Sequence, residues 1–222
     1  MTIDKSPDKI EYMFNELAKD YDRNNNIISF GLHNLIKCFA VKESGIKNGD
    51  VVFDLCCGTG DIAGLLSKIY SDIDISGYDF SDEMLEIARN KYPDIKFQKA
   101  DITRLPVGSC LADAITISFG LRNVFDRSCA INEMYRVLKS QGQVIHLDFG
   151  KHNIFSHIFD VIVRFLIKNF SKSVSAYEYL LNSKSEFPEP TQLIEEFEKC
   201  GFKLLKRKNF LLGIISMQVF VK

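Results

Sequence analysis

The chain has 222 residues, of which 46% are hydrophobic, and its formal net charge at pH 7 is -1. This length fits a single domain of medium size, and the apolar share is sufficient for a full core. A nearly neutral chain has no overall field that would attract a polyanion, so we expect no nucleic-acid partner. The six cysteines form no C-x-x-C pair and the N-terminus has no apolar signal segment, which predicts no metal site and a cytoplasmic protein with reduced thiols.

Residues 1–45 predict a helical cap at the start of the chain. Ser6 and Pro7 fit the beginning of a helix, because proline is tolerated in the first turn. The polar, asparagine-rich residues 20–29 predict a loop. A second helix is predicted over residues 32–41.

From residue 50 to residue 150 short apolar strands alternate with helices. Ser81 is suited to cap the helix predicted over residues 82–91. Because the strands are apolar almost throughout, they predict a parallel sheet buried on both faces, and therefore a doubly wound α/β fold. The predicted strands are residues 51–55, 73–78, 95–99, 113–118 and 144–149, and the other predicted helices are 62–69 and 128–138.

The pattern changes after residue 150. Residues 151–200 predict a helical insertion with helices at 152–170 and 191–200, and residues 201–222 predict two final strands, at 202–208 and 213–221. The chain is thus predicted to be one domain, residues 1–222, with a seven-stranded, mostly parallel sheet. The helix at 152–170 carries three charged residues, so we do not expect it to cross a membrane. Its wide apolar arc leaves four interpretations open: a tunnel for an isoprenoid tail, contact with a membrane surface, a homodimer face, or core packing.

The segment DLCCGTGD, residues 54–61, joins the first predicted strand to a helix. Gly58 and Gly60 let the backbone pass close to a ligand, and the helix N-terminus offers unpaired N–H groups. Asp79 and Asp101 follow the second and third strands, where carboxylates can accept ribose hydroxyls or reach an adenine amino group. Ligands bind at these strand ends in doubly wound sheets, so we predict a nucleoside-type cofactor.

Two cofactors compete for this site. The G-x-G-x-x-A pattern from Gly58 to Ala63, with Asp79 at a suitable distance, also fits a dinucleotide. A dinucleotide pyrophosphate, however, needs a free helix N-terminus, whereas Asp54 and Asp61 flank this loop with negative charge. That arrangement favours a cationic cofactor with an ammonium and a sulfonium group.

The segment ISFGLRNV, residues 117–124, is more specific than the cofactor loop, and it resembles the ubiquinone/menaquinone biosynthesis C-methyltransferase family. The similarity extends over nearly the whole chain. It includes YDRNNNIISFGLH at 21–33, GYDFS at 77–81, EMYRVLK at 133–139 and EFP at 186–188. The resemblance implies a Rossmann-like fold of the class I methyltransferase type and S-adenosyl-L-methionine as the cofactor. It further implies methylation of a ring carbon of a prenylated quinol, from demethylmenaquinol to menaquinol or the equivalent step of ubiquinone biosynthesis.

The resemblance also implies which residues contact the cofactor. Thr59 matches the loop contact, Asp79 matches the ribose carboxylate, and Ser118 matches the contact at the end of the fourth strand. Asp101 and Ile102 match the adenine-side pair. The full predicted cofactor-binding set is Asp54, Gly58, Thr59, Gly60, Asp79, Asp101, Ile102 and Ser118.

Four residues are candidates for catalysis of such a methyl transfer. Arg122 is suited to stabilise a phenolate or position a water, with an ion pair to Asp126 as the structural alternative. Asn123 is suited to hydrogen-bond the quinol oxygen. Asp148 could serve as a base or anchor a loop, and His33 could shuttle a proton or be structural.

The chain also departs from the family pattern. Asn24 stands where the family usually has methionine, and Asn34 and Leu35 stand where it usually has arginine and tryptophan. We expect these positions near the substrate entrance. A methyltransferase for another small molecule therefore stays open as an alternative, and a non-catalytic cofactor-binding scaffold is a second, separate alternative. A prenylated substrate would bring the protein to the inner face of a membrane as a peripheral protein.

Overall fold

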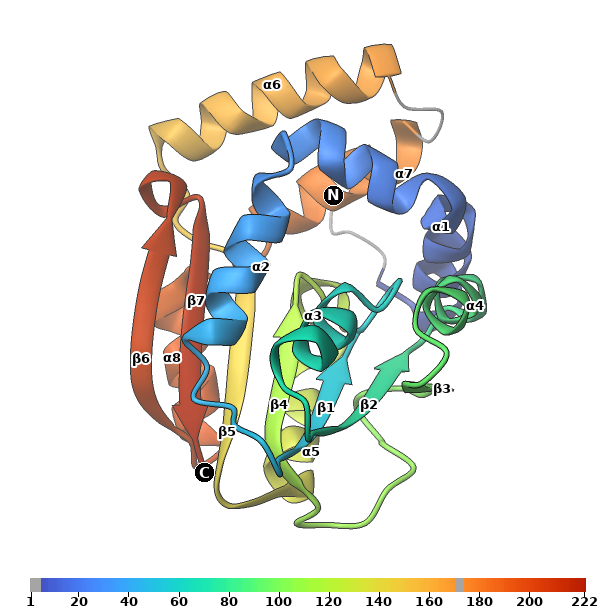
Figure 1. The fold of residues 1–222 in the computed structure, drawn as a ribbon. Coiled ribbons are helices and arrows are strands. Elements are labelled where there is room, and N and C mark those ends of the chain that lie inside the picture. Colours follow the sequence, from blue (N-terminus) through green and yellow to red (C-terminus); the bar gives the residue numbers. More distant parts are fainter. Residues whose placement is uncertain (1–4, 171–173) are drawn as a thin grey trace.

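The computed structural model describes residues 5–170 and 174–222, and it describes their side chains except those of residues 170–177. In this part of the chain a seven-stranded sheet lies at the centre (Figure 1). Its strands are β1 (Val51–Leu55), β2 (Asp74–Asp79), β3 (Lys96–Lys99), β4 (Ala112–Ser118), β5 (Leu138–Phe149), β6 (Lys203–Phe210) and β7 (Ile215–Val221). The strand order is β3-β2-β1-β4-β5-β7-β6. Strand β7 is antiparallel to both of its neighbours, and the other neighbouring strands are parallel. The predicted fold class is confirmed.

Helices cover both faces of the sheet, as strands that are apolar on both sides require. The helices on one face are α2 (Leu32–Lys42), α3 (Asp61–Ile69) and α4 (Asp82–Lys91), and those on the other are α5 (Arg127–Val137) and α8 (Pro190–Lys199). Between α8 and the sheet the rings of Phe197 and Phe220 stack with centroids 4.0 Å apart. Each face therefore has its own apolar core.

A third apolar cluster lies above the carboxyl ends of the parallel strands. It is formed by α1 (Pro7–Ser29), α6 (Ile154–Phe170) and α7 (Val174–Ser185), together with Met84 of α4. Leu17 of α1 and Val163 of α6 are buried in it. Figure 1 shows α1 and α6 crossing the top of the molecule. These helices roof the edge of the sheet at which the cofactor residues are predicted.

The predicted loop at residues 20–29 is wrong, because α1 continues as one helix to Ser29. Two tertiary contacts stabilise its second half: Asn24 is buried, and Asp22 accepts hydrogen bonds from the cofactor loop and from α4. The helix ends where Phe30 and Gly31 adopt positive φ angles of 50° and 73°. Low helix propensity of asparagine is overridden here by packing.

The other predicted elements are found where expected, with shifted ends. Ser81 caps α4 by accepting a hydrogen bond from the Met84 backbone N–H at 3.2 Å. The predicted strand at 144–149 is only the second half of β5, which begins at Leu138 and has an irregular register opposite Ala112 and Ala114. Two short 3-10 helices complete the fold, η1 (Leu121–Asn123) directly after β4 and η2 (Leu211–Gly213) between β6 and β7.

Candidate active site

A cavity of about 230 Å³ opens at the carboxyl ends of β1, β2, β3 and β4. Gly58 follows β1, Asp79 ends β2, Asp101 follows β3 and Ser118 ends β4. The roof of the cavity comes from the N-terminal segment and α1, through residues that include Lys5, Pro7, Ile10, Phe14 and Tyr21. The parallel strand ends thus meet at one hollow, as the topology of a doubly wound sheet requires.

The part of the cavity near β2 and β3 is lined by carboxylates that the backbone holds in place. Asp79 accepts hydrogen bonds from the backbone N–H groups of Gly58 at 2.7 Å and Ser81 at 2.9 Å. Burial raises the pKa of Asp79 above its usual range, although these hydrogen bonds oppose the effect. Asp101 accepts from the Thr103 N–H at 2.8 Å, which fixes its orientation.

Five of the predicted cofactor-binding residues line the cavity: Gly58, Asp79, Asp101, Ile102 and Ser118. Two observations fit a ligand at this place. The buried Ser118 hydroxyl has no hydrogen-bond partner among the described residues, which is costly unless a ligand or water supplies one. Gly58 has a φ of +53°, and a Cβ placed on it would meet open space, so the loop presents bare backbone to the cavity.

The other three predicted cofactor-binding residues do not line the cavity, and their contacts stabilise the loop at residues 54–61 from the side away from the cavity. The buried Asp54 carboxylate accepts from the Thr116 hydroxyl at 2.7 Å and from the Ala63 N–H at 3.2 Å, and burial raises its pKa to about 7. The Thr59 hydroxyl points to α1 and donates to Asp22 at 2.7 Å. A Cβ on Gly60 would lie 2.9 Å from the Phe97 ring, so this glycine permits close packing.

The expected negative charge beside the loop is largely neutralised at Asp61. Its carboxylate pairs with the ammonium groups of Lys37 at 3.1 Å and Lys91 at 3.0 Å. Burial would raise the pKa of Asp61, but the two lysines outweigh it and lower this pKa to about 2. The structure therefore does not support the expectation that Asp61 attracts a cationic cofactor.

On the β4 side of the cavity, Asn123 and Arg122 lie next to each other in η1 but point differently. Asn123 lines the cavity, and its side-chain oxygen is buried without a partner among the described residues. The buried Arg122 guanidinium donates instead to the Phe119 carbonyl at 2.5 Å and to the Asp148 carboxylate at 3.0 Å. Its ion pair is thus with Asp148, not with Asp126, and neither Arg122 nor Asp148 lines the cavity.

His33 lies away from the cavity, on α2. Its ring Nδ1 is 2.6 Å from the Ser29 hydroxyl. Burial and the nearby Lys37 lower the pKa of His33 to about 4, so the ring is neutral at pH 7. The departures from the family pattern are also outside the cavity lining: Asn24 is buried in α1, while Leu35 is exposed on α2.

Lys5 and Phe125 also line the cavity, although no sequence motif marked either of them. Lys5 lies before the first helix, in a segment without the periodic pattern of apolar residues that would predict its position in the fold. Tyr21, from the segment at 21–33, lines the cavity. In the described parts of the chain, no group of three His, Cys, Asp or Glu residues is placed to hold a metal, and no helix is long and apolar enough to cross a membrane.

Comparison with known proteins reveals similarity in sequence and in fold. A family model described as the ubiE/COQ5 methyltransferase family matches residues 2–222. The demethylmenaquinone methyltransferase of Staphylococcus aureus (strain JH9) is 35% identical over 225 residues, which cover 97% of this chain and 93% of that relative.

Two solved structures resemble the fold at low sequence identity. A SAM dependent methyltransferase from Aquifex aeolicus has a TM-score of 0.66 at 15% identity and covers 99% of each chain. Phosphoethanolamine N-methyltransferase 2 of Haemonchus contortus, solved in complex with S-adenosyl-L-methionine, has a TM-score of 0.65 at 16% identity and covers 86% of this chain and 52% of that one.

Proposed function

Because the chain belongs to the ubiE/COQ5 methyltransferase family and is an S-adenosylmethionine-dependent methyltransferase, we propose that it methylates a ring carbon of a prenylated quinol. The Staphylococcus aureus relatives are named demethylmenaquinone methyltransferases, which favours demethylmenaquinol as the substrate. One observation carries the proposal: a single cavity contains both the carboxylates at the ends of β2 and β3 and, on its β4 side, Asn123 with an unpaired oxygen.

The residues near β2 and β3 suit the nucleoside of the cofactor. Asp79 would accept the ribose hydroxyls, Asp101 and Ile102 would border the adenine, and the bare backbone at Gly58 would pass beneath the methionine portion. When bound, S-adenosylmethionine supplies a methyl group activated by a sulfonium. The unpaired Ser118 hydroxyl is available to the same ligand.

Methylation of a ring carbon requires that a neighbouring phenolic oxygen push electron density into the ring. The enzyme must therefore align the quinol and stabilise its phenolate form. Asn123 is placed to hydrogen-bond a quinol oxygen, because its amide faces the cavity. Arg122 and Asp148 act as positioning residues: their buried ion pair, at 3.0 Å, fixes η1 and with it Asn123.

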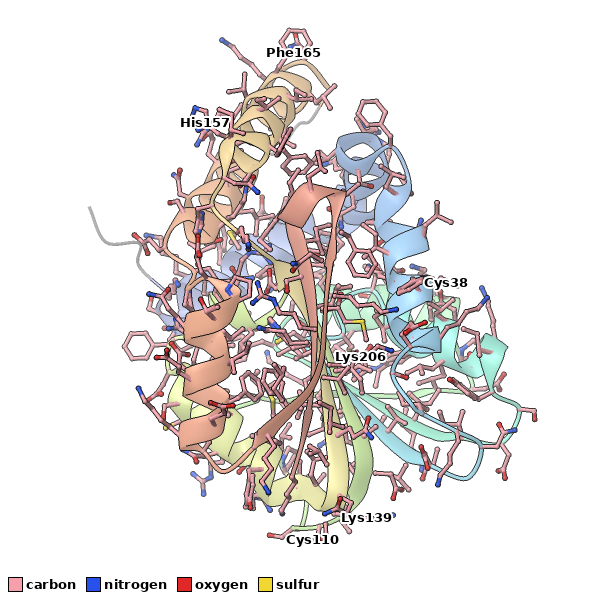
Figure 2. All side chains as sticks on the ribbon, turned by 90° about the vertical axis from the view of Figure 1, so that its left-hand side faces the viewer. Cys38, Cys110, Lys139, His157, Phe165 and Lys206 are labelled. Atoms are coloured by element: carbon pink, nitrogen blue, oxygen red, sulfur yellow. The ribbon has the colours of Figure 1, made fainter. Side chains whose placement is uncertain are left out.

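Contact with the inner face of a membrane would give a cytoplasmic protein access to a prenylated quinol. Six apolar side chains are exposed among the described residues of α6, and Phe165 points away from the body of the protein (Figure 2). Phe165→Glu and Ile158→Glu should weaken co-sedimentation with anionic lipid vesicles. Sedimentation velocity without vesicles distinguishes this use of α6 from a homodimer face, because only a dimer face makes the mass depend on these two residues.

Mass spectrometry of quinones tests the proposed reaction in the cell. Cells that lack this protein should accumulate the quinone without its ring methyl group, and a plasmid-borne copy should restore the methylated form. An unchanged quinone profile would point to a different substrate. Calorimetry with S-adenosylmethionine adds a separate test, since absence of binding would exclude any methyltransferase activity.

A further inference from the structure

Lys5 is the one cationic side chain among the described residues that line the cavity. The other charged residues of the lining are the acids Asp79, Asp101 and Asp126. Arg122, the cation expected from the sequence, is turned away toward Asp148 and the Phe119 carbonyl. Among the described side chains of the lining, Lys5 therefore supplies the positive charge for a phenolate formed in this cavity.

The surroundings of Lys5 place it with the acceptor side of the cavity. The residue is half-buried just before α1, and the charges that act on it most strongly belong to Arg127 of α5, Glu186, Arg122 of η1 and Asp148 of β5. Arg122 and Asp148 are the pair that positions Asn123. Lys5 therefore feels the charges of the pair that positions Asn123, and Lys5 and Asn123 line the same cavity.

We propose that Lys5 binds the phenolic oxygen next to the ring carbon that is methylated and accepts its proton; this inference rests on the proposed function. In the proton transfer the phenol O–H bond breaks, a bond forms between that proton and the lysine Nζ, and the products are a phenolate and an ammonium. The ammonium then lies beside the new negative charge and stabilises it. No further reactant is needed for this step.

The electrostatics of the site are compatible with a lysine that accepts protons. Burial, and then the positive charge of Arg127, lower the pKa of Lys5 below its usual range, while Glu186 and Asp148 oppose the shift. A lowered pKa increases the neutral, proton-accepting fraction of the amine at a given pH. Activity that depends on the neutral amine should rise as the pH increases through the pKa of Lys5.

The test uses full-length protein and a demethylmenaquinol with a short prenyl tail, kept reduced under anaerobic conditions. Lys5→Met should lower kcat/KM for the quinol by about 100-fold or more, the range typical for loss of a general base. The Kd for S-adenosylmethionine should not change. Lys19→Met is the matched control, because Lys19 is an exposed lysine of α1 outside the cavity, and it should behave like the wild type.

The pH profile separates proton transfer from a structural effect. In the Lys5→Met variant, the pH at which kcat/KM rises should shift upward toward the pKa of the phenol itself, which is about 10 by analogy with tyrosine. Lys5→Arg should keep quinol binding but show the same displaced profile, since an arginine does not accept a proton near neutral pH.

Three results would overturn the inference. A Lys5→Met enzyme with the wild-type pH profile would exclude proton transfer to Lys5. A loss of S-adenosylmethionine affinity in step with turnover would place the lysine at the cofactor instead. A lowered melting temperature with an unshifted profile would make its role structural. By contrast, a wild-type enzyme that fails to methylate the quinol would refute the proposed function itself, before any variant is compared.

Discussion

Replacing Asp148 with leucine should destabilise the protein severely, because the buried guanidinium of Arg122 loses its carboxylate partner. The side chains of Arg122 and Asp148 are 5% and 0% exposed, and their closest charged atoms are 3.0 Å apart. Removing one partner of a buried ion pair typically costs about 3–5 kcal/mol, since the other charge stays buried without compensation. The Phe119 carbonyl, which also accepts from Arg122, cannot neutralise that charge.

Two comparisons isolate the charge from the loss of packing. Asp148→Asn keeps an oxygen that can accept from Arg122 and from the Phe149 N–H, so it should cost less than the leucine variant. The double variant Arg122→Met with Asp148→Leu removes both charges and should be more stable than Asp148→Leu alone, as found for other buried pairs replaced by apolar residues. His146 does not replace Arg122, because its Nε2 is 4.0 Å from the carboxylate and burial lowers its pKa.

Urea denaturation followed by circular dichroism gives the free energies of unfolding for a double-mutant cycle of the wild type, Arg122→Met, Asp148→Leu and the double variant. We expect a favourable coupling between the two side chains that exceeds about 1 kcal/mol. A cost below about 1 kcal/mol for Asp148→Leu would mean that the pair is hydrated in solution. Arg122 would then be able to turn into the cavity, and its assignment as a positioning residue would be wrong.

Two further predictions concern the cofactor loop. Burial raises the pKa of Asp54 from 3.8 to about 7, so the folded state binds a proton more tightly than the unfolded chain; stability should fall by on the order of 4 kcal/mol as the pH rises from about 4 to about 7. Asp54→Asn should remove this pH dependence in urea denaturation, and an unchanged slope would show that the carboxyl titrates normally. Asp22→Ala removes the acceptor of the Thr59 hydroxyl and a partner of Lys91, and should weaken S-adenosylmethionine binding about five- to tenfold in calorimetry. The control is Asp20→Ala on the same helix, and equal affinity of the two variants would exclude a role of α1 in holding the loop.

The features predicted well from the sequence are those set by local patterns. Apolar strands alternating with helices determine the mostly parallel sheet. Parallel strands end at a common edge, so residues at or just after these ends, such as Asp79, Asp101 and Ser118, line the cavity. Ser81 caps its helix because its position and residue type suffice for that.

The features missed from the sequence depend on tertiary contacts. The asparagine-rich half of α1 is helical because Asn24 is buried and Asp22 holds Thr59, partners that lie far away in the chain. The direction of the Arg122 side chain is decided by Asp148, which is 26 residues distant. Lys5 reaches the cavity only because the roof is assembled from the N-terminal segment. None of these pairings leaves a periodic pattern in the sequence.

The most direct measurement is transfer of an isotopically labelled methyl group to the proposed substrate. The purified protein is incubated anaerobically with reduced demethylmenaquinone and S-adenosylmethionine that carries carbon-13 in its methyl group, and the product is analysed by NMR. We expect the labelled methyl on a ring carbon of the quinol and an equal amount of S-adenosylhomocysteine. A labelled methyl on a quinol oxygen, or no transfer by a protein that binds S-adenosylmethionine, would contradict the proposed C-methylation.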